Sequence, residues 1–275
     1  MFTSCVDTAI LLERFGFSEF RPGQAKVIES LLTTGRALAV FPTGGGKSLC
    51  YQLPALQIEG LTLVVSPLIA LMKDQIDFLQ KRGIPAAKLD STCTQEELFA
   101  INQQIESGEV KLLYVAPERF NNERFLAQMR RIRIGLFAVD EAHCISEWGH
   151  NFRPDYLKLA ETARDLGVER VLALTATATP TVVDDVCTAF DIPVGDATVT
   201  GFYRPNLTML MTPCPAEDRR EKLLGMLRDR PTGSTIVYVT LQKTAESVAD
   251  WLAHKGIAAK AYHAGLGTED RTEVF

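Results

Sequence analysis

The feature that most constrains the fold is a glycine-rich segment, residues 41–48, that follows the short apolar run 37–40 and precedes a helix-like sequence. Glycines let the backbone curl around an anion where a Cβ would clash, and amides at a helix start point towards a bound phosphate. Lys47 can reach the β- and γ-phosphates of a nucleotide, and the Ser48 hydroxyl can bind Mg²⁺. The general pattern asks for glycine at the position of Phe41, so the match is partial and a glycine-rich surface turn is the alternative. The residues expected around the phosphates are Thr43, Gly44, Gly45, Gly46, Lys47 and Ser48.

Length, cysteine usage and charge exclude several classes of protein. The 275 residues suffice for one or two domains, and no apolar stretch approaches the ~18 residues of a membrane span. The first residues lack the basic segment of a secretory signal. The six cysteines are widely spaced with no Cys-x-x-Cys pair, which argues against a zinc site and for a reducing compartment. Because the net charge is −5, any contact with a polynucleotide must come from a local surface.

Apolar runs of strand length alternate with helix-like segments through about residue 191, which predicts an α/β fold with a doubly wound, mostly parallel sheet. Thr94 and Glu97 form a capping box that predicts the start of one of the helices. Ligands of such sheets bind beyond the carboxyl ends of the strands. The glycine-rich segment, Ser66, Ala116, Asp140 and Thr175 all follow strands, so we expect them at one edge. The predicted strands are 37–40, 61–65, 86–89, 110–115, 134–139 and 171–174.

The chain divides into three parts by composition. Residues 1–200 form the first α/β domain, and residues 201–215, which contain three prolines, form a linker. A second α/β pattern occupies residues 216–275, about half the usual ~100–150 residues of such a domain, so we expect a second domain that is cut short. Its predicted elements are helices over 216–228 and 244–254 and strands over 235–239 and 258–262.

An acidic pair, Asp140 and Glu141, follows the apolar run 134–139 and is the natural partner of a phosphate-binding loop. Asp140 would hold the hydrated Mg²⁺, and Glu141 would orient and deprotonate the attacking water. The alternative is an acidic pair that caps a helix. His143 is placed to sense the γ-phosphate or a neighbouring domain, unless it is simply a polar residue in a turn.

Other residues carry weaker signals. Trp148, Phe152 and Tyr156 recur every four residues, which is typical of a core stripe, but Gly149 and Pro154 argue against one continuous helix. The functional alternative is a loop in which Trp148 and Phe152 stack on bases while Arg153 binds phosphate or a carboxylate. Thr175 and Thr177 either bridge to a second domain or form simple turns. The amide of Gln24 either matches one edge of adenine or is exposed to solvent.

Taken together, these motifs resemble a RecQ-type DNA helicase of superfamily 2, from residue 15 to about residue 266. Each motif is weak or moderate alone, whereas the ordered set is highly specific. The motifs are Phe17 with Phe20–Gln24, Pro42–Ser48, Ser66–Gln75, Tyr114–Arg119, Asp140–His143, Trp148–Pro154, Leu174–Thr179, Phe202–Leu207, Ile236–Val239 and Tyr262–Leu266.

The resemblance implies two RecA-like lobes, the second truncated here, with ATP and Mg²⁺ between them. It implies that Lys47, Asp140 and Glu141 are catalytic and that an apolar residue is normal at the position of Phe41. It assigns Arg21 and Gln24 to adenine recognition and Phe17 to stacking on the base. It also implies that the loop 145–154 couples DNA, single-stranded or partly duplex, to ATP hydrolysis in repair or recombination.

The chain also departs from the family pattern. The second-lobe motif whose arginines reach the γ-phosphate, the four-cysteine zinc module and the winged-helix domain are all missing from these 275 residues. We therefore expect the chain to bind ATP·Mg²⁺, to hydrolyse it slowly and to unwind little DNA, since such an arginine contributes ~10³–10⁵ in rate. The alternatives are a non-motor module that binds nucleotide and DNA, and a motor that acts on RNA. The expected location is the bacterial cytoplasm, near the nucleoid, or the eukaryotic nucleus.

Overall fold

The computed structural model describes residues 12–90, 93–148, 153–202, 206–231 and 233–267. The chain divides into two compact units, residues 1–205 and 206–275. Among the residues that the structure describes, no helix combines the length and the apolar character needed to cross a membrane.

The first unit is built on a sheet in which every described strand pairing is parallel. The strand order is β3-β4-β2-β5-β6-β1-β7. Strand β6 therefore lies between β1, which precedes the glycine-rich segment, and β5, which precedes the acidic pair. The prediction of a parallel α/β fold is therefore confirmed. The strands are β1 Arg36–Val40, β2 Leu61–Val65, β3 Ala86–Leu89, β4 Leu112–Val115, β5 Ile134–Val139, β6 Val171–Thr175 and β7 Ala197–Val199.

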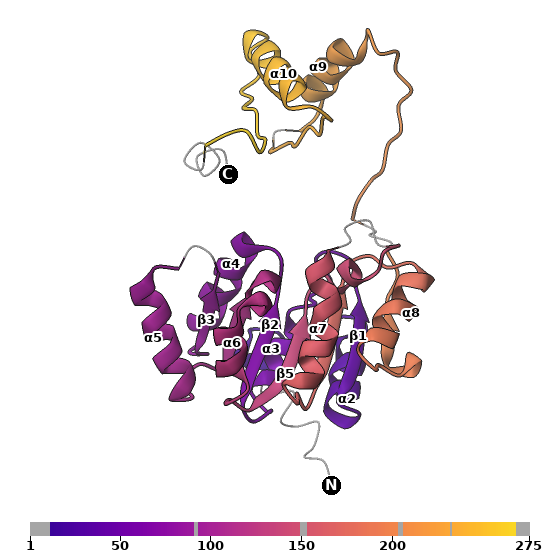
Figure 1. Ribbon diagram of the computed structural model, residues 1–275. Helices are drawn as coiled ribbons and strands as arrows, with labels where there is room; N and C mark the ends of the chain where they lie inside the picture. Colours follow the sequence, from indigo (N-terminus) through magenta and orange to yellow (C-terminus); the bar gives the residue numbers. More distant parts are fainter. Residues whose placement is uncertain (1–11, 91–92, 149–152, 203–205, 232, 268–275) are drawn as a thin grey trace. The chain divides into compact units, whose positions relative to one another are not determined.

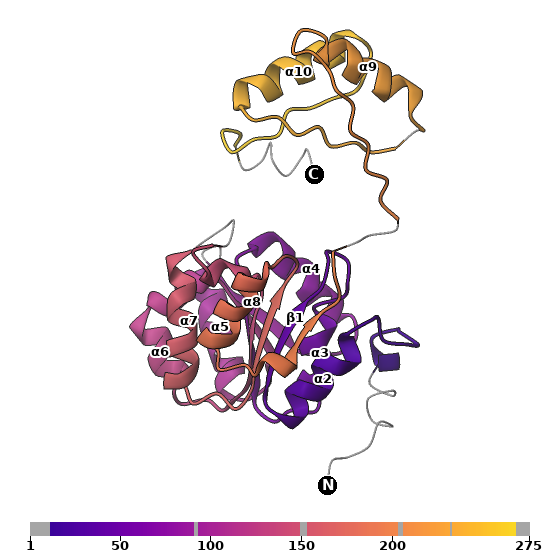
Figure 2. The same ribbon diagram turned by 90° about the vertical axis from the view of Figure 1, so that its right-hand side faces the viewer.

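Helices cover both faces of this sheet (Figures 1 and 2). One face carries α2 Gln24–Thr33, α3 Leu49–Ala55 and α4 Ile69–Gln80. The other carries α5 Gln95–Glu106, α6 Glu123–Met129, α7 Pro154–Asp165 and α8 Pro180–Ala189. Short 3₁₀ turns complete the connections at η1 Pro117–Asn121, η2 Ala142–Ile145 and η3 Val194–Asp196.

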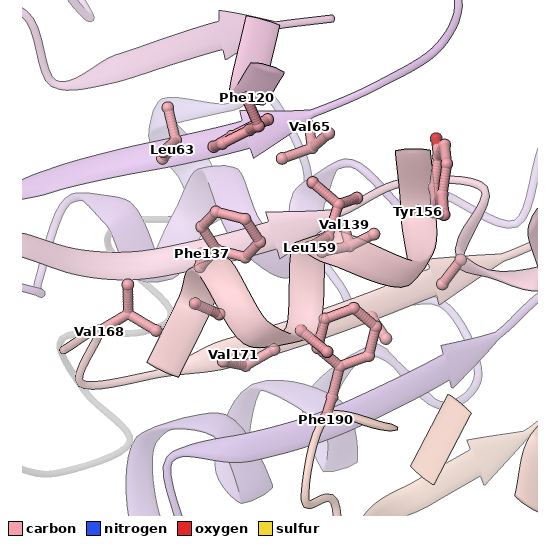
Figure 3. Close-up of a cluster of buried hydrophobic side chains, with 14 of the residues drawn as sticks. Leu63, Val65, Phe120, Phe137, Val139, Tyr156, Leu159, Val168, Val171 and Phe190 are labelled. Atoms are coloured by element: carbon pink, nitrogen blue, oxygen red, sulfur yellow. The ribbon is translucent and has the colours of Figure 1, made fainter. Parts of the chain in front are cut away.

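Successive residues of a strand contribute to two separate cores. Phe137 and Val139 of β5 pack under α5–α8 with Tyr156 (Figure 3), whereas Leu136 and Ala138 pack on the side of α2–α4. All residues of β2 and β5 are buried, which explains why these strands read as continuous apolar runs rather than alternating ones. Each fully buried large side chain stabilises the fold by about 1.5–3 kcal/mol, so these central strands anchor the sheet.

The start of α5 follows directly from its sequence. The Thr94 hydroxyl accepts a hydrogen bond from the Glu97 amide at 3.2 Å, and the Glu97 carboxylate accepts one from the Thr94 amide at 2.8 Å. The predicted capping box is therefore present. It satisfies two amides that the first turn of a helix leaves without partners, and it begins the helix at Gln95.

The second unit contains both predicted helices, as α9 Arg219–Asp229 and α10 Gln242–His254. The two strands predicted over 235–239 and 258–262 are wrong, because the structure assigns neither segment to a strand. Ile236 is 77% exposed and Tyr238 89% exposed. An extended segment becomes a buried strand only when neighbouring strands pair with it, and no sheet is assigned in the described part of this unit.

Candidate active site

The carboxyl ends of the central strands bring the predicted phosphate loop and the acidic pair to the same edge of the sheet. At the end of β1, the Phe41 amide donates a hydrogen bond to the Thr175 carbonyl of β6 at 3.1 Å. At the end of β5, the Asp140 amide donates one to the Val65 carbonyl of β2 at 2.8 Å. Because all these strands are parallel, residues far apart in the sequence leave the sheet on one side.

The glycine-rich segment adopts a backbone that requires glycine. Gly44 and Gly46 both have φ +80°, in the left-handed region that residues with a Cβ rarely adopt. A Cβ on Gly45 would lie 2.8 Å from the Pro42 carbonyl oxygen, and a Cβ on Gly46 would collide with the Gln24 amide nitrogen. The loop closes on itself through a 2.8 Å hydrogen bond from the Gly45 amide to the Pro42 carbonyl. This tight turn is what a phosphate-binding loop needs.

Two residues expected to recognise adenine are bound directly to this loop. The Gln24 side chain is buried, accepts a hydrogen bond from the Arg21 amide at 2.8 Å and donates one to the Gly46 carbonyl at 2.8 Å. The Arg21 guanidinium donates to the Gly44 carbonyl. The third expected residue, Phe17, has a 40% exposed side chain that is open to stacking. The contacts of Arg21 and Gln24 with the loop were not predicted, because nothing in local sequence spacing indicates them.

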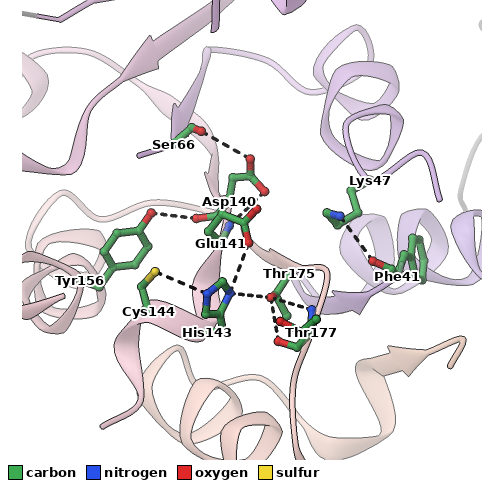
Figure 4. A network of polar contacts seen from close by, with 10 residues as sticks. All are labelled: Phe41, Lys47, Ser66, Asp140, Glu141, His143, Cys144, Tyr156, Thr175 and Thr177. Atoms are coloured by element: carbon green, nitrogen blue, oxygen red, sulfur yellow. Dashed lines mark hydrogen bonds and ion pairs between the residues drawn. The ribbon is translucent and has the colours of Figure 1, made fainter. Parts of the chain in front are cut away.

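Lys47 and Ser48 lie where the loop turns into α3. The Lys47 ammonium is 3.4 Å from the Phe41 carbonyl, across the mouth of the loop (Figure 4). Ser48 immediately precedes the first residue of α3, and its carbonyl accepts hydrogen bonds from the Tyr51 amide at 3.2 Å and the Gln52 amide at 3.0 Å. The positive charge of Lys47 and the curled loop suit a polyphosphate, which carries the opposite charge.

Asp140 is a partly buried carboxylate with few compensating donors. It accepts hydrogen bonds from the Ser66 hydroxyl at 3.4 Å and from the Glu141 amide at 3.0 Å. Burial, and then the charge of Glu141, raise the pKa of Asp140 to about 6, although the charge of Lys47 lowers it. A divalent cation would favour the ionised form. Hydroxyl and carboxylate oxygens are ligands that Mg²⁺ prefers, and it commonly takes one or two carboxylates plus phosphates, so Ser48 and Asp140 fit it.

His143 connects the acidic pair to β6. Its Nδ1 lies 2.8 Å from the Thr175 hydroxyl and 3.2 Å from the Glu141 carboxylate (Figure 4). Hydrogen bonds with the Cys144 thiol and then with Glu141 raise the pKa of His143 to about 9, so its imidazole is protonated at neutral pH. Thr175 donates to the Thr177 carbonyl at 3.0 Å and accepts from the Thr177 amide at 3.3 Å. Thr175 thus forms the turn and bridges to His143 at the same time.

The loop predicted to couple DNA binding begins beside this network. Trp148 is 79% exposed and Arg153 is exposed, so core packing does not describe either side chain. The other predicted stacking residue, Phe152, lies outside the described residues. The Ser146 hydroxyl donates to the Asp185 carboxylate of α8 at 2.5 Å and accepts from the Trp148 amide at 3.2 Å. These contacts fix the start of the loop to the body of the unit.

One contact of the site was missed at the sequence level. Tyr156, noted only as a member of an aromatic repeat, is fully buried and donates a hydrogen bond to the main-chain carbonyl of Asp140 at 3.0 Å. Its apolar spacing indicates burial correctly. The hydrogen-bond partner of its hydroxyl depends on how α7 packs against the end of β5, and no sequence pattern predicts that packing.

Comparison with known proteins places the chain among helicases. The pattern of the family described as DEAD/DEAH box helicase matches residues 21–186. The ATP-dependent DNA helicase RecQ of Bacillus subtilis (strain 168) is 41% identical over 268 residues, which are 96% of this chain and 45% of that protein. The ATP-dependent DNA helicase Q1 of Rattus norvegicus is 38% identical over 275 residues, 96% of this chain and 44% of that protein. The chain thus spans less than half the length of these relatives.

A solved structure shares the fold. The crystal structure of the DUF1998 helicase MrfA bound to DNA and AMPPNP aligns with a TM-score of 0.70 at 17% sequence identity, covering 98% of this chain and 41% of that one. The expected resemblance to RecQ helicases is confirmed by the sequence relatives, and the RecA-like fold by the structural one. The chain belongs to the DEAD/DEAH box helicase family.

Proposed function

We propose that these residues form the nucleotide-binding part of an ATP-dependent DNA helicase. The observation that carries the proposal is the meeting of two features at one sheet edge: a tight loop with glycines at positive φ, and a partly buried carboxylate, Asp140, whose pKa is raised by desolvation and by the neighbouring charge of Glu141. A nucleotide with its Mg²⁺ supplies the negative charge that suits the first feature and the positive charge that suits the second.

The residues have separate roles in this proposal. The loop amides and Lys47 bind the phosphates, while Arg21 and Gln24 connect the loop to the base. Ser48 and Asp140 would hold Mg²⁺, which would neutralise negative charge on the phosphates of the nucleotide. Glu141 accepts a proton from the attacking water, and His143 beside it holds its carboxylate in place through their 3.2 Å ion pair.

DNA is the partner that we propose, in single-stranded or partly duplex form. The support comes from relatives that are named DNA helicases, from a structural neighbour solved with DNA, and from the exposed side chains of Trp148 and Arg153. An exposed indole can stack on any base, and a guanidinium binds phosphate. A role in repair or recombination, and a location in the DNA-containing compartment, follow from this proposal.

The 275-residue polypeptide by itself is proposed to be a weak motor. The described part of its second unit contains the helices α9 and α10 but no sheet, so it lacks the parallel sheet of a complete RecA-like lobe. The second candidate function, a module that binds nucleotide and DNA without translocating, rests on the same observation. Both candidates bind ATP·Mg²⁺, and only the motor shows turnover that DNA accelerates.

The decisive experiment measures binding of a fluorescent ATP analogue with and without Mg²⁺, and ATP turnover with and without single-stranded DNA or RNA. Lys47→Ala should weaken nucleotide binding by about 10–100-fold, because it removes a charge-assisted contact with phosphate. Lys26→Ala, on the exposed side of α2, is the matched control and should bind like the unaltered chain. Binding that is insensitive to Lys47→Ala would contradict the proposal.

A further inference from the structure

The hydroxyl of Tyr156 makes a hydrogen bond whose position has mechanistic consequences. Tyr156 lies in the first turn of α7, and its ring is packed with Leu159 and Val139 in the core under that helix (Figure 3). Its hydroxyl is directed at Asp140 and donates to the main-chain carbonyl of that residue at 3.0 Å (Figure 4). A buried hydroxyl needs a hydrogen-bond partner, and in this protein that partner is the main chain of the acidic pair.

The peptide group that Tyr156 holds is the junction between the two acidic side chains. On its amino side, Asp140 is fixed by its 2.8 Å hydrogen bond to Val65 in the sheet. On its carboxyl side, the backbone leaves the extended conformation and Glu141 adopts φ +51°, a left-handed conformation uncommon for a residue with a side chain. The Asp140 carbonyl lies in the peptide that makes this change. Its orientation therefore determines where the Glu141 side chain points relative to the Asp140 carboxylate.

Tyr156 is also connected, through the main chain of Arg153, to the turn η2. The Arg153 amide donates to the Cys144 carbonyl at 3.0 Å, and the Tyr156 amide donates to the Arg153 carbonyl at 2.9 Å. These two bonds hold the first turn of α7 beside η2, the turn that follows the acidic pair.

We propose that Tyr156 is a positioning residue that sets the geometry of the Asp140–Glu141 pair. This inference rests on the proposed function, since it assigns Tyr156 a part in binding Mg²⁺ with a nucleotide. Tyr156 does not contact the reacting atoms. It acts through the main chain of Asp140, so its loss alters the Mg²⁺-dependent part of nucleotide binding and leaves the Mg²⁺-independent part unchanged.

The test compares Tyr156→Phe with Tyr114→Phe in the full 275-residue chain. Both substitutions remove a single buried hydroxyl and keep the ring, but the Tyr114 hydroxyl contacts Gln52 at 3.3 Å and Tyr51 at 3.5 Å rather than Asp140. We expect Tyr156→Phe to raise the Mg²⁺ concentration for half-maximal binding of a fluorescent ATP analogue about tenfold. Binding in EDTA should change less than about twofold, and kcat should fall about tenfold with KM nearly constant.

The outcomes distinguish a failure of the proposed nucleotide-binding function from a failure of the role of Tyr156 alone. If the unaltered chain shows no Mg²⁺-dependent nucleotide binding, the proposed function fails and this inference fails with it. If the unaltered chain binds but Tyr156→Phe and Tyr114→Phe have the same Mg²⁺ dependence, only the role of Tyr156 is overturned. Measurements are made well below the unfolding midpoint of each variant. A purely structural role would weaken binding in EDTA and in Mg²⁺ equally, and that result also overturns the inference.

Discussion

The imidazole of His143 and the hydroxyl of Thr175 meet at 2.8 Å and join the segment after β5 to the end of β6. Through the 3.2 Å contact of His143 with Glu141, this pair connects the acidic residues to the turn at Thr175–Thr177. Both side chains of the pair are buried, so the connection is sheltered from solvent. A contact of this kind is expected to be specific in geometry and sensitive to the charge of the imidazole.

The protonated form of His143 should stabilise the fold, and its contribution should disappear at high pH. The folded pKa of about 9 lies above the ordinary value of 6.5, so this stabilisation is fully present below pH 6.5 and is lost as the pH rises through 9. We expect the difference in unfolding free energy between the unaltered chain and His143→Gln to shrink by about 1–2 kcal/mol between pH 6.5 and 9.5. Denaturant unfolding at both pH values measures it.

A matched control for this prediction is Thr175→Val, which removes the hydroxyl partner but keeps the imidazole and Glu141. The chain should be less stable overall, yet its unfolding free energy should still decrease with pH as in the unaltered chain. A pH-independent difference for His143→Gln would mean that the imidazole does not titrate in this range.

Gly46→Ala should impair both the fold and the phosphate loop. The new Cβ would face the Gln24 amide nitrogen, and φ +80° is itself unfavourable for alanine, by about 1–2 kcal/mol. We expect nucleotide affinity to fall at least about tenfold because the loop must open to relieve the collision. Gly83→Ala is the control, since Gly83 has φ +68° but nothing near its added Cβ. It should lose similar stability and keep full affinity for a fluorescent ATP analogue.

Sequence reasoning located the strand ends and the loop because both depend on local signals. The continuous apolar runs of β2 and β5 indicate strands that are buried on both faces of the sheet. Because the sheet is parallel, residues 41–48 and Asp140 then lie at the same edge. The strand β7, Ala197–Val199, was not predicted, since three residues with only one of them buried carry no recognisable pattern. The helix α6 was also missed, despite the cap that Asn122 provides, because it is short and only Phe125 and Met129 are buried.

Contacts between distant segments were beyond the reach of sequence reasoning. The hydrogen bonds of Gln24 to Gly46 and of Tyr156 to Asp140 join residues 22 and 16 positions apart, and they depend on how helices pack on the sheet. The strands over 235–239 and 258–262, by contrast, were predicted but are not present in the structure. The β-branched and aromatic residues of 235–239 have the right local preference, but that preference is realised only with pairing partners, whereas 258–262 has a single aromatic residue, Tyr262, and no β-branched one.

Asp140→Asn should make the protein more stable while it abolishes the response to Mg²⁺. The folded pKa of about 6 exceeds the ordinary 3.8, so the ionised carboxylate destabilises the fold above pH 6 and this penalty is absent below pH 3.8. Removing the charge at pH 8 without Mg²⁺ should therefore raise the unfolding free energy by about 1–3 kcal/mol. Nucleotide binding should then be the same in Mg²⁺ and in EDTA. Asp77→Asn, at an exposed position of α4, should change neither quantity.

Trp148→Ala should weaken DNA binding without a cost in stability. The indole is 79% exposed, so its removal should change the unfolding free energy by less than about 0.5 kcal/mol. If it stacks on a base, affinity for single-stranded DNA should fall about 5–100-fold, and any stimulation of ATP turnover by DNA should be lost while basal turnover persists. Phe99→Ala on α5 removes another aromatic side chain, 66% exposed, that has no proposed role. Fluorescence anisotropy with a labelled oligonucleotide compares the two variants, and equal affinities would exclude stacking by Trp148.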